Sequence, residues 1–241
     1  GLSYTYITRT MQEKLGKEDV NLIVCHLGSG ASMCAVCNGK SLDTTMGFTP
    51  LDGLMMGTRS GSIDPEIVRY LVESKGMSLE EVFNELNFNS GFIGLTGVND
   101  VRDILTLVEK GDKLATLALN KFENQVASYI VTYHNMLKQY TGKDKEIDGI
   151  IFTAGIGENS SKIRKDIIDK LYSLNIKIKE EENSHIAGYL PQKGGLISTD
   201  DSQIKVYVEP TNEEIIILDD MMDLLGYTKK NNTLKVRRLE K

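Results

Sequence analysis

Short apolar runs separated by turn residues dominate the first quarter of the chain. Residues 22–26 and 33–37 are predicted strands on either side of a glycine turn, and Asn38-Gly39 marks a second tight turn before a strand over residues 41–44. This order predicts an antiparallel meander. Residues 45–63 then show no regular spacing, and a loop of that length inside a compact domain usually has a function.

Helical spacing of apolar residues replaces this pattern from residue 64 onward. Asp64-Pro65 provides an N-cap and a first-turn proline, Gly76 provides a stop, and Ser78-Leu-Glu-Glu81 forms a capping box. A long stretch without glycine or proline then indicates one extended helix. The predicted helices cover about residues 65–75, 78–86, 100–110 and 112–140.

Buried strands and helices alternate in the remainder of the chain. Gly149–Thr153 is a continuous apolar run that is typical of a buried strand. Gly155-Ile-Gly157 is predicted to turn the chain into a helix from about Ser160 to Leu174. Residues 183–199 are predicted to form an irregular surface segment. A strand over 204–208 and a helix over 211–225, with Thr211 as its cap, are predicted to follow.

The succession of elements predicts an α/β fold. We expect one domain, residues 1–228, and a basic tail, residues 229–241, which holds six basic residues against one glutamate. A membrane-binding or nucleic-acid-binding arm is one interpretation of this tail. Because it is short and has no aromatic residue for stacking, a solvated segment or the end of a terminal helix is the favoured one. The formal charge of −6 argues against a general nucleic-acid-binding protein.

Composition places the chain among ordinary globular proteins, with 40% hydrophobic and 26% charged residues. No run approaches the roughly 18 apolar residues that a membrane span needs, and the first residues lack the regions of a secretory signal. Cys25, Cys34 and Cys37 are an odd number, which is consistent with a reducing compartment and a cytoplasmic location. Cys34 and Cys37 resemble a redox or zinc pair, but residues three apart on a strand point to opposite faces. We expect structural thiols.

Glycine-rich segments are the candidate nucleotide sites. Gly39-Lys40-Ser41 ends like a P-loop, but Cys34 stands where that motif needs its first glycine, so this interpretation fails. Gly155-Ile-Gly157 follows a strand and opens a helix, yet Ser160 replaces the third glycine of a dinucleotide fingerprint, and a plain turn is an equal alternative. His26-Leu-Gly-Ser-Gly30 is a strand followed by a glycine turn whose amides can face an anion.

Charged residues near these turns suggest further chemistry. Arg59 lies between Gly57 and Gly61, so the backbone can bring its guanidinium into a cleft, where it could clamp a phosphoryl or carboxylate group. A solvated loop arginine is the alternative. On sequence alone, Asp100 is a helix cap, and Glu213 is an acid favoured by the dipole of the helix that it opens.

Four segments together resemble the acetate kinases, in the order of that family. They are residues 21–65, Asn99–Asp103, Phe152–Asn159 and Pro210–Glu214. The resemblance implies a ribonuclease-H-like domain, shared by sugar kinases, actin and heat-shock ATPase chaperones. It also implies reversible phosphoryl transfer from ATP to acetate, giving ADP and acetyl phosphate, with Mg²⁺, or Mn²⁺ as an alternative, bridging the phosphates.

The resemblance also assigns roles to individual residues. It implies that Arg59 is catalytic and that Glu213 positions the metal. The nucleotide-binding residues that it implies are His26, Leu27, Gly28, Ser29 and Gly30 at the phosphates, Asp100, Val101 and Arg102 at the adenosine, and Gly155, Ile156, Gly157, Glu158 and Asn159 at the adenine. The departures from the family pattern are Ser29 for asparagine, Val101 for an aromatic residue, Tyr4 for histidine and Leu2 for threonine.

Chains of the acetate kinase family begin with another domain, which carries more of the acyl-acceptor pocket. The resemblance therefore implies that this chain is the C-terminal half, with the N-terminal half and a second copy of the enzyme as partners. Alone, it is expected to bind Mg-ATP weakly and to be inactive. Propionate kinases match these motifs almost as well, and butyrate kinases are more distant. The alternative to an enzyme is a non-catalytic module that binds nucleotide or forms a dimer.

Overall fold

A mixed β-sheet forms the centre of the computed structural model, which describes residues 1–186, 194–225, 227–230 and 233–236, the last two ranges by their backbone alone. Within these residues the main sheet has six strands in the order β3-β2-β1-β4-β6-β5. Its strands are β1 (Leu22–Leu27), β2 (Ala31–Cys37), β3 (Lys40–Thr44), β4 (Gly149–Thr153), β5 (Gly195–Leu196) and β6 (Val206–Val208). Strands β1, β2 and β3 pair antiparallel, which confirms the predicted meander, whereas β1, β4 and β6 run parallel.

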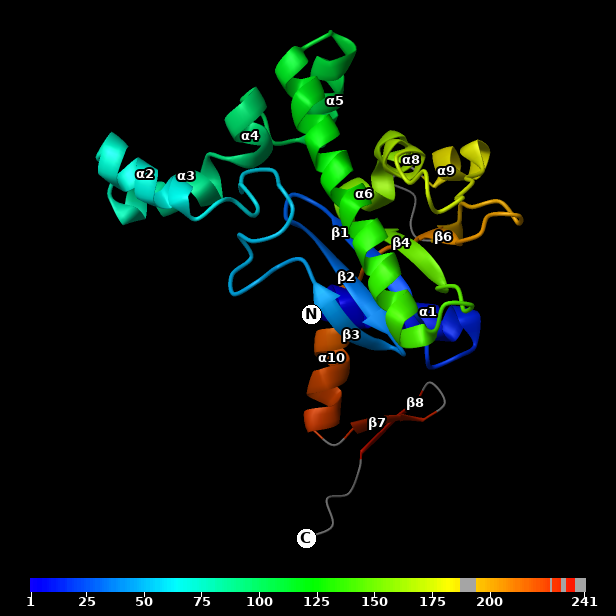
Figure 1. The fold of residues 1–241 in the computed structure, drawn as a ribbon. Helices are drawn as coiled ribbons and strands as arrows, with labels where there is room; N and C mark the ends of the chain where they lie inside the picture. The colour runs from blue at the N-terminus through cyan, green and yellow to red at the C-terminus, as the bar shows by residue number, and fades with distance from the viewer. Residues whose placement is uncertain (187–193, 226, 231–232, 237–241) are drawn as a thin grey trace.

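Helices cover both faces of the sheet and extend beyond its edges (Figure 1). The long α6 crosses one face and α1 lies on the other. The described helices are α1 (Leu2–Leu15), α2 (Glu66–Lys75), α3 (Leu79–Phe88), α4 (Gly91–Thr96), α5 (Val101–Glu109), α6 (Lys113–Thr141), α7 (Ala154–Asn159), α8 (Ser161–Asp169), α9 (Glu180–His185) and α10 (Glu213–Leu224). None of them has the length and apolar character of a membrane span.

Two apolar cores follow from the alternation of side chains along the buried strands. Met33 and Ala35 of β2 join the core under α6, while Cys34 and Val36 join the core under α1. The same alternation sends Cys37 to the α6 side, opposite Cys34, and all three cysteines are free thiols. The interpretation of these cysteines as structural thiols is therefore supported by their positions.

Local capping signals marked the starts of α3, α5 and α6, but the N-cap of α2 is Pro65 and not Asp64 as predicted, although the Asp64 carboxylate accepts from the Glu66 amide. The Ser78 hydroxyl and the Glu81 carboxylate form the reciprocal capping box at α3. Asp100 and Asp112 each accept a hydrogen bond from a backbone amide in the first turn of α5 and α6. The long helix was also predicted correctly, from its lack of glycine and proline.

Several elements differ from the predictions. The glycines of Gly155–Gly157 do not form a loop, because α7 starts directly after β4 with Ala154 at φ +66°. Asn212, not Thr211, caps α10, since the Asn212 side chain accepts from the Ile215 amide. The segment 183–199, predicted to be irregular and at the surface, includes the buried Asn183, the end of α9 and strand β5. Its residues 187–193 lie outside the described residues. Helix α8 ends at residue 169, and α1 and α4 were not predicted.

Helix α2 forms as its apolar spacing predicts, yet it buries none of its side chains. Together with α3 it projects from the body of the molecule (Figure 1). At the other end of the chain, a hairpin of β7 (Tyr227–Lys230) and β8 (Thr233–Val236) crosses the predicted boundary between domain and tail. That boundary stays a prediction, and the side chains of the basic tail lie outside the described residues.

Candidate functional site

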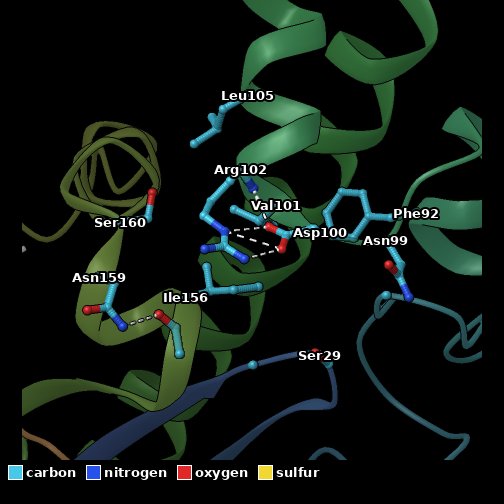
Figure 2. Close-up of a pocket in the computed structure, with 13 residues that line it drawn as sticks. Ser29, Phe92, Asn99, Asp100, Val101, Arg102, Leu105, Ile156, Asn159 and Ser160 are labelled. Carbon is cyan, nitrogen blue, oxygen red and sulfur yellow. Dashed lines mark hydrogen bonds and ion pairs between the residues drawn. The ribbon is translucent and has the colours of Figure 1, made fainter. Parts of the chain in front are cut away.

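A pocket of about 540 Å³ opens where the β1–β2 turn meets the first turn of α5 and helix α7 (Figure 2). Its lining combines three of the segments that the sequence singled out. The predicted residues that line it are Gly28, Ser29, Asp100, Val101, Arg102, Gly155, Ile156 and Asn159. The fold therefore brings together at one site residues that are more than 100 positions apart in the chain.

Sequence reasoning missed part of the lining. The additional residues are Gly57, Phe92, Asn99, Leu105 and Ser160. Asn99 belongs to a recognised segment but was given no role, Ser160 directly follows another, and Gly57 was noted only for its place beside Arg59. Phe92 and Leu105 carried no signal, because an apolar residue in a helix is ordinarily part of a core. With Val101 and Ile156 they give the pocket an apolar wall beside its polar groups, which suits a flat heteroaromatic ligand.

Arg102 and Asp100 form an ion pair at the pocket. The Arg102 Nη2 lies 2.5 Å from Asp100 Oδ2, and its Nε lies 3.0 Å from Oδ1. Hydrogen bonds from the Arg102 side chain and backbone amide lower the pKa of Asp100 to about 2. Asp100 thus caps α5, as expected, and also orients the guanidinium within the pocket. Val101, in contrast, is only 8% exposed and belongs mainly to the core.

The glycine turn after β1 is tied to the long glycine-rich loop. Within the turn, the Gly28 amide donates to the Gly30 carbonyl over 3.1 Å. The Gly57 amide donates to the Ser29 carbonyl, also over 3.1 Å, and a Cβ on Gly57 would lie 3.3 Å from that oxygen. Glycine at position 57 therefore permits the close approach of the two segments.

Arg59 lies on the Gly30 side of this turn and does not line the pocket itself. Its Nη1 donates to the Pro50 carbonyl over 3.3 Å. The loop around it is held by α4, because the amides of Phe92 and Ile93 donate to loop carbonyls, and Gly91 adopts φ +63° where a Cβ would clash with the Met56 carbonyl. Arg59 forms no ion pair with any described residue, so its charge remains available to an anionic ligand.

His26 and Glu213 lie away from the pocket, near α1. The His26 ring contacts Tyr4 edge to face, with ring centres 6.4 Å apart. Burial lowers the pKa of His26, although the carboxylates of Glu213 and Glu158 act in the opposite direction. Its Nδ1 is buried and has no hydrogen-bond partner within the described structure, whereas Glu213 is exposed and accepts from the Ser3 hydroxyl.

The residues of α7 divide into two groups. Gly155 faces open space, since no atom lies within 4 Å of the position of a Cβ, whereas a Cβ on Gly157 would contact the backbone of β4 at 3.4 Å. Glu158 does not line the pocket either: its Oε1 accepts from the Ala154 amide over 2.8 Å and from the Thr211 amide over 3.2 Å. Glu158 therefore ties α7 to the segment before α10. Leu27 is fully buried and contributes its side chain to the core.

The described residues contain no cluster of three or more histidine, cysteine or acidic side chains that could hold a metal ion. Glu213 offers one exposed carboxylate close to His26. One carboxylate is compatible with Mg²⁺, because this ion keeps several waters and commonly binds through one or two carboxylates together with substrate phosphates. The chain thus fits a metal that arrives with a nucleotide.

The chain is similar in sequence and in structure to acetate and propionate kinases. The model of the acetokinase family matches residues 1–219. Acetate kinase from Chlorante-Aster yellows phytoplasma is 45% identical over 225 residues, which are 93% of this chain and 52% of that protein. The crystal structure of Porphyromonas gingivalis acetate kinase superposes with a TM-score of 0.84 at 33% identity, covering 93% of this chain and 54% of that one. A propionate kinase from Francisella tularensis gives 0.81 at 42% identity, covering 90% and 53%.

These matches have two consequences. The chain spans about half the length of the relatives that it matches. Their shared architecture confirms the predicted α/β fold of the ribonuclease-H-like kind.

Proposed function

Because the chain belongs to the acetokinase family, we propose that it is the nucleotide-binding half of a carboxylate kinase that transfers the γ-phosphoryl group of ATP to acetate. The observation that carries this proposal is the convergence of the β1–β2 turn, α5 and α7 on one pocket, with Arg59 on the other side of the turn. The pocket with its apolar wall would take the base of ATP, the glycine turn would take the phosphates, and the Arg59 guanidinium, which forms no ion pair with a described residue, would take the transferred group.

Adenosine occupies the pocket in this proposal. The base lies against the open backbone of Gly155 and the side chain of Ile156, while Asn159 and the Asp100–Arg102 pair offer polar contacts to the base and ribose. Val101 has no ring to stack on the base, so part of the apolar contact comes from Phe92.

The phosphates follow the turn from Gly28 through Ser29 to Gly30, with His26 behind it. An acetate oxygen attacks the γ-phosphorus in line, the bond from that phosphorus to the bridging oxygen breaks, and ADP leaves with the electron pair. Arg59 stabilises the negative charge on the transferring group. Glu213 would hold Mg²⁺, or Mn²⁺, through water, and the metal would neutralise phosphate charge when bound.

The proposal includes two partners for this chain, which spans about half the length of its relatives. The N-terminal half of the same enzyme would supply more of the acyl-acceptor pocket, and a second copy would pair with this half. We place this activity in the cytoplasm, because the three cysteines are free thiols, as is usual in a reducing compartment. Propionate is the second candidate acceptor, because a propionate kinase is among the similar structures, at 42% identity.

Calorimetric titration of the 241-residue chain with Mg-ATP tests the nucleotide site. Gly155→Leu should abolish binding, because its side chain would enter the pocket without backbone strain, and Gly155→Ala should weaken it less. Lys143→Leu, in the exposed segment after α6, is the control and should bind as the wild type does. No binding by the wild-type chain, or equal binding by Gly155→Leu, would overturn the proposal.

A further inference from the structure

Arg164 of α8 is the largest fully buried side chain among the described residues, with 0% of its surface exposed. Four hydrogen bonds surround its guanidinium. Nη1 donates to the carbonyls of Gly157 and Glu158, each over 2.9 Å. Nε donates to Asn183 Oδ1 over 2.8 Å, and Nη2 donates to the Asn183 carbonyl over 2.6 Å.

These acceptors are all uncharged, and Arg164 forms no ion pair with a described residue. Burial without a carboxylate lowers the pKa of Arg164 to about 10, so the side chain still carries its charge at neutral pH. A buried charge is costly unless its hydrogen bonds are well formed. The carbonyl groups that accept hydrogen bonds from this guanidinium are therefore held in place, because moving them would leave a buried charge without its hydrogen bonds.

Two of the carbonyls belong to the last turn of α7, the helix that forms one wall of the pocket. A six-residue helix has little stability of its own, and this one begins with a non-glycine residue, Ala154, at φ +66°. Its start is joined to the segment before α10, because the Glu158 carboxylate of the same helix accepts from both the Ala154 amide and the Thr211 amide. Its end is tied by Arg164. The intervening Gly155 and Ile156 face the pocket from a segment that is fixed at both ends.

Asn183 extends this connection to α9. Its Nδ2 donates to the Ser161 carbonyl over 2.9 Å, while its own oxygens accept from Arg164. The amide thus orients the guanidinium toward α7. Neither Arg164 nor Asn183 lines the pocket, so any effect on a ligand acts through the position of α7.

We propose that Arg164 is a positioning residue that sets the affinity for the adenosine part of the nucleotide by fixing the α7 wall. This proposal rests on the proposed nucleotide-binding function. It differs from a general structural role because it affects one end of the ligand. Loss of the hydrogen bonds from Arg164 to α7 should weaken contacts to the base. The glycine turn that faces the phosphates connects β1 and β2 and should keep its geometry.

Arg164→Lys tests the proposal, because lysine keeps the charge but lacks the planar fork that reaches two carbonyls. Calorimetry would compare the affinities of the wild-type and variant chains for Mg-ATP and for magnesium tripolyphosphate, which has no adenosine. We expect ATP affinity to fall about tenfold or more, as for the loss of a charge-assisted hydrogen bond to a buried group, and tripolyphosphate affinity to stay unchanged. Lys162→Met, a charge removal on the exposed side of the same helix, should change neither.

Amide hydrogen exchange provides a readout that does not depend on ligand binding. In Arg164→Lys, the amides of residues 154–159 should lose at least about tenfold of their protection, while the core amides of α6 keep theirs. Asn183→Ala, which removes the side chain that orients the guanidinium, should give the same pattern more weakly, and it serves if Arg164→Lys does not fold. Unchanged protection of α7, or equal loss of ATP and tripolyphosphate binding, would overturn the proposal. Failure of the wild-type chain to bind ATP would instead overturn the proposed function.

Discussion

The guanidinium of Arg59 lies against the backbone of Gly30, so that a Cβ on Gly30 would be 3.4 Å from Arg59 Nη1. The two residues come from different segments, the turn after β1 and the long loop before α2. They are brought together by the hydrogen bond from the Gly57 amide to the Ser29 carbonyl. This contact places a positive charge at the Gly30 end of the turn, next to Gly28 and Ser29, which line the pocket.

Arg59→Ala in the intact enzyme should lower turnover far more than it weakens ATP binding. A fixed guanidinium matches the charge of the transferring group better in the transition state than in bound ATP, and an arginine that reaches this group contributes up to about 10³ to 10⁵ in rate. Lysine should rescue poorly, because it lacks the bidentate fork. Steady-state kinetics and ATP titration would be compared with Arg69→Ala, which removes an exposed arginine of α2. Turnover within a few-fold of the wild type would show that Arg59 is not the main catalytic residue.

Substitutions at Gly30 should disturb Arg59 in proportion to their size. An alanine methyl group just fits at 3.4 Å from Nη1, but the branches of valine would occupy the space of the guanidinium. Gly30→Ala should therefore keep most of the turnover of the intact enzyme, and Gly30→Val should lose most of it with a smaller change in ATP affinity. Equal activity of the two variants would mean that this contact does not position Arg59.

The 241-residue chain alone should form no measurable acetyl phosphate from Mg-ATP and acetate. It contains the candidate nucleotide pocket, but it spans about half the length of its relatives. A coupled assay for ADP release and a hydroxamate assay for acetyl phosphate would measure this. Robust product formation by the purified chain would contradict the view that the other half supplies essential acceptor groups.

Self-association should involve the outward face of α6. This face exposes apolar side chains, Leu117 at 58% and Val131 at 40%, and uncharged apolar surface of this kind is typical of the centre of an interface. Light scattering should give a dimer mass for the wild type and a monomer mass for Leu117→Glu. Leu79→Glu changes an equally exposed leucine of α3 and should leave the dimer intact. A wild-type monomer at high concentration would refute the prediction, and dissociation by Leu79→Glu alone would assign another surface.

His26 should make the stability of the chain depend on pH. Burial lowers the pKa of His26 in the folded state, so the unfolded chain binds a proton at higher pH than the folded chain does. Stability is therefore complete above the unfolded pKa of about 6.5, falls as the pH drops below it, and levels off beneath the folded pKa. Urea unfolding at about pH 7.5 and 5.5 should show a smaller decrease for His26→Gln than for the wild type. His185→Gln, at an exposed position, is the control, and identical decreases in all three proteins would contradict the assignment.

Local signals in the sequence determined much of the secondary structure. The Ser78–Glu81 capping box, the caps Asp100 and Asp112, and the glycine turn after β1 each act over a few residues, so the chain needs no distant partner to form them. The resemblance to acetate kinases likewise identified the segments that form the pocket, because those motifs are contiguous in the chain.

Tertiary structure alone decided how these pieces face one another. A six-residue helix such as α7 is too short to form on local propensity. Its last carbonyls accept from the Arg164 guanidinium, which Asn183 of α9 orients, and the Glu158 carboxylate joins its first amide to the amide of Thr211 before α10. The same packing turns Glu158 away from the pocket and brings Phe92 into it. The apolar spacing of α2 predicted a helix correctly but not its exposure, because spacing reports which residues share a face and burial depends on what packs against that face.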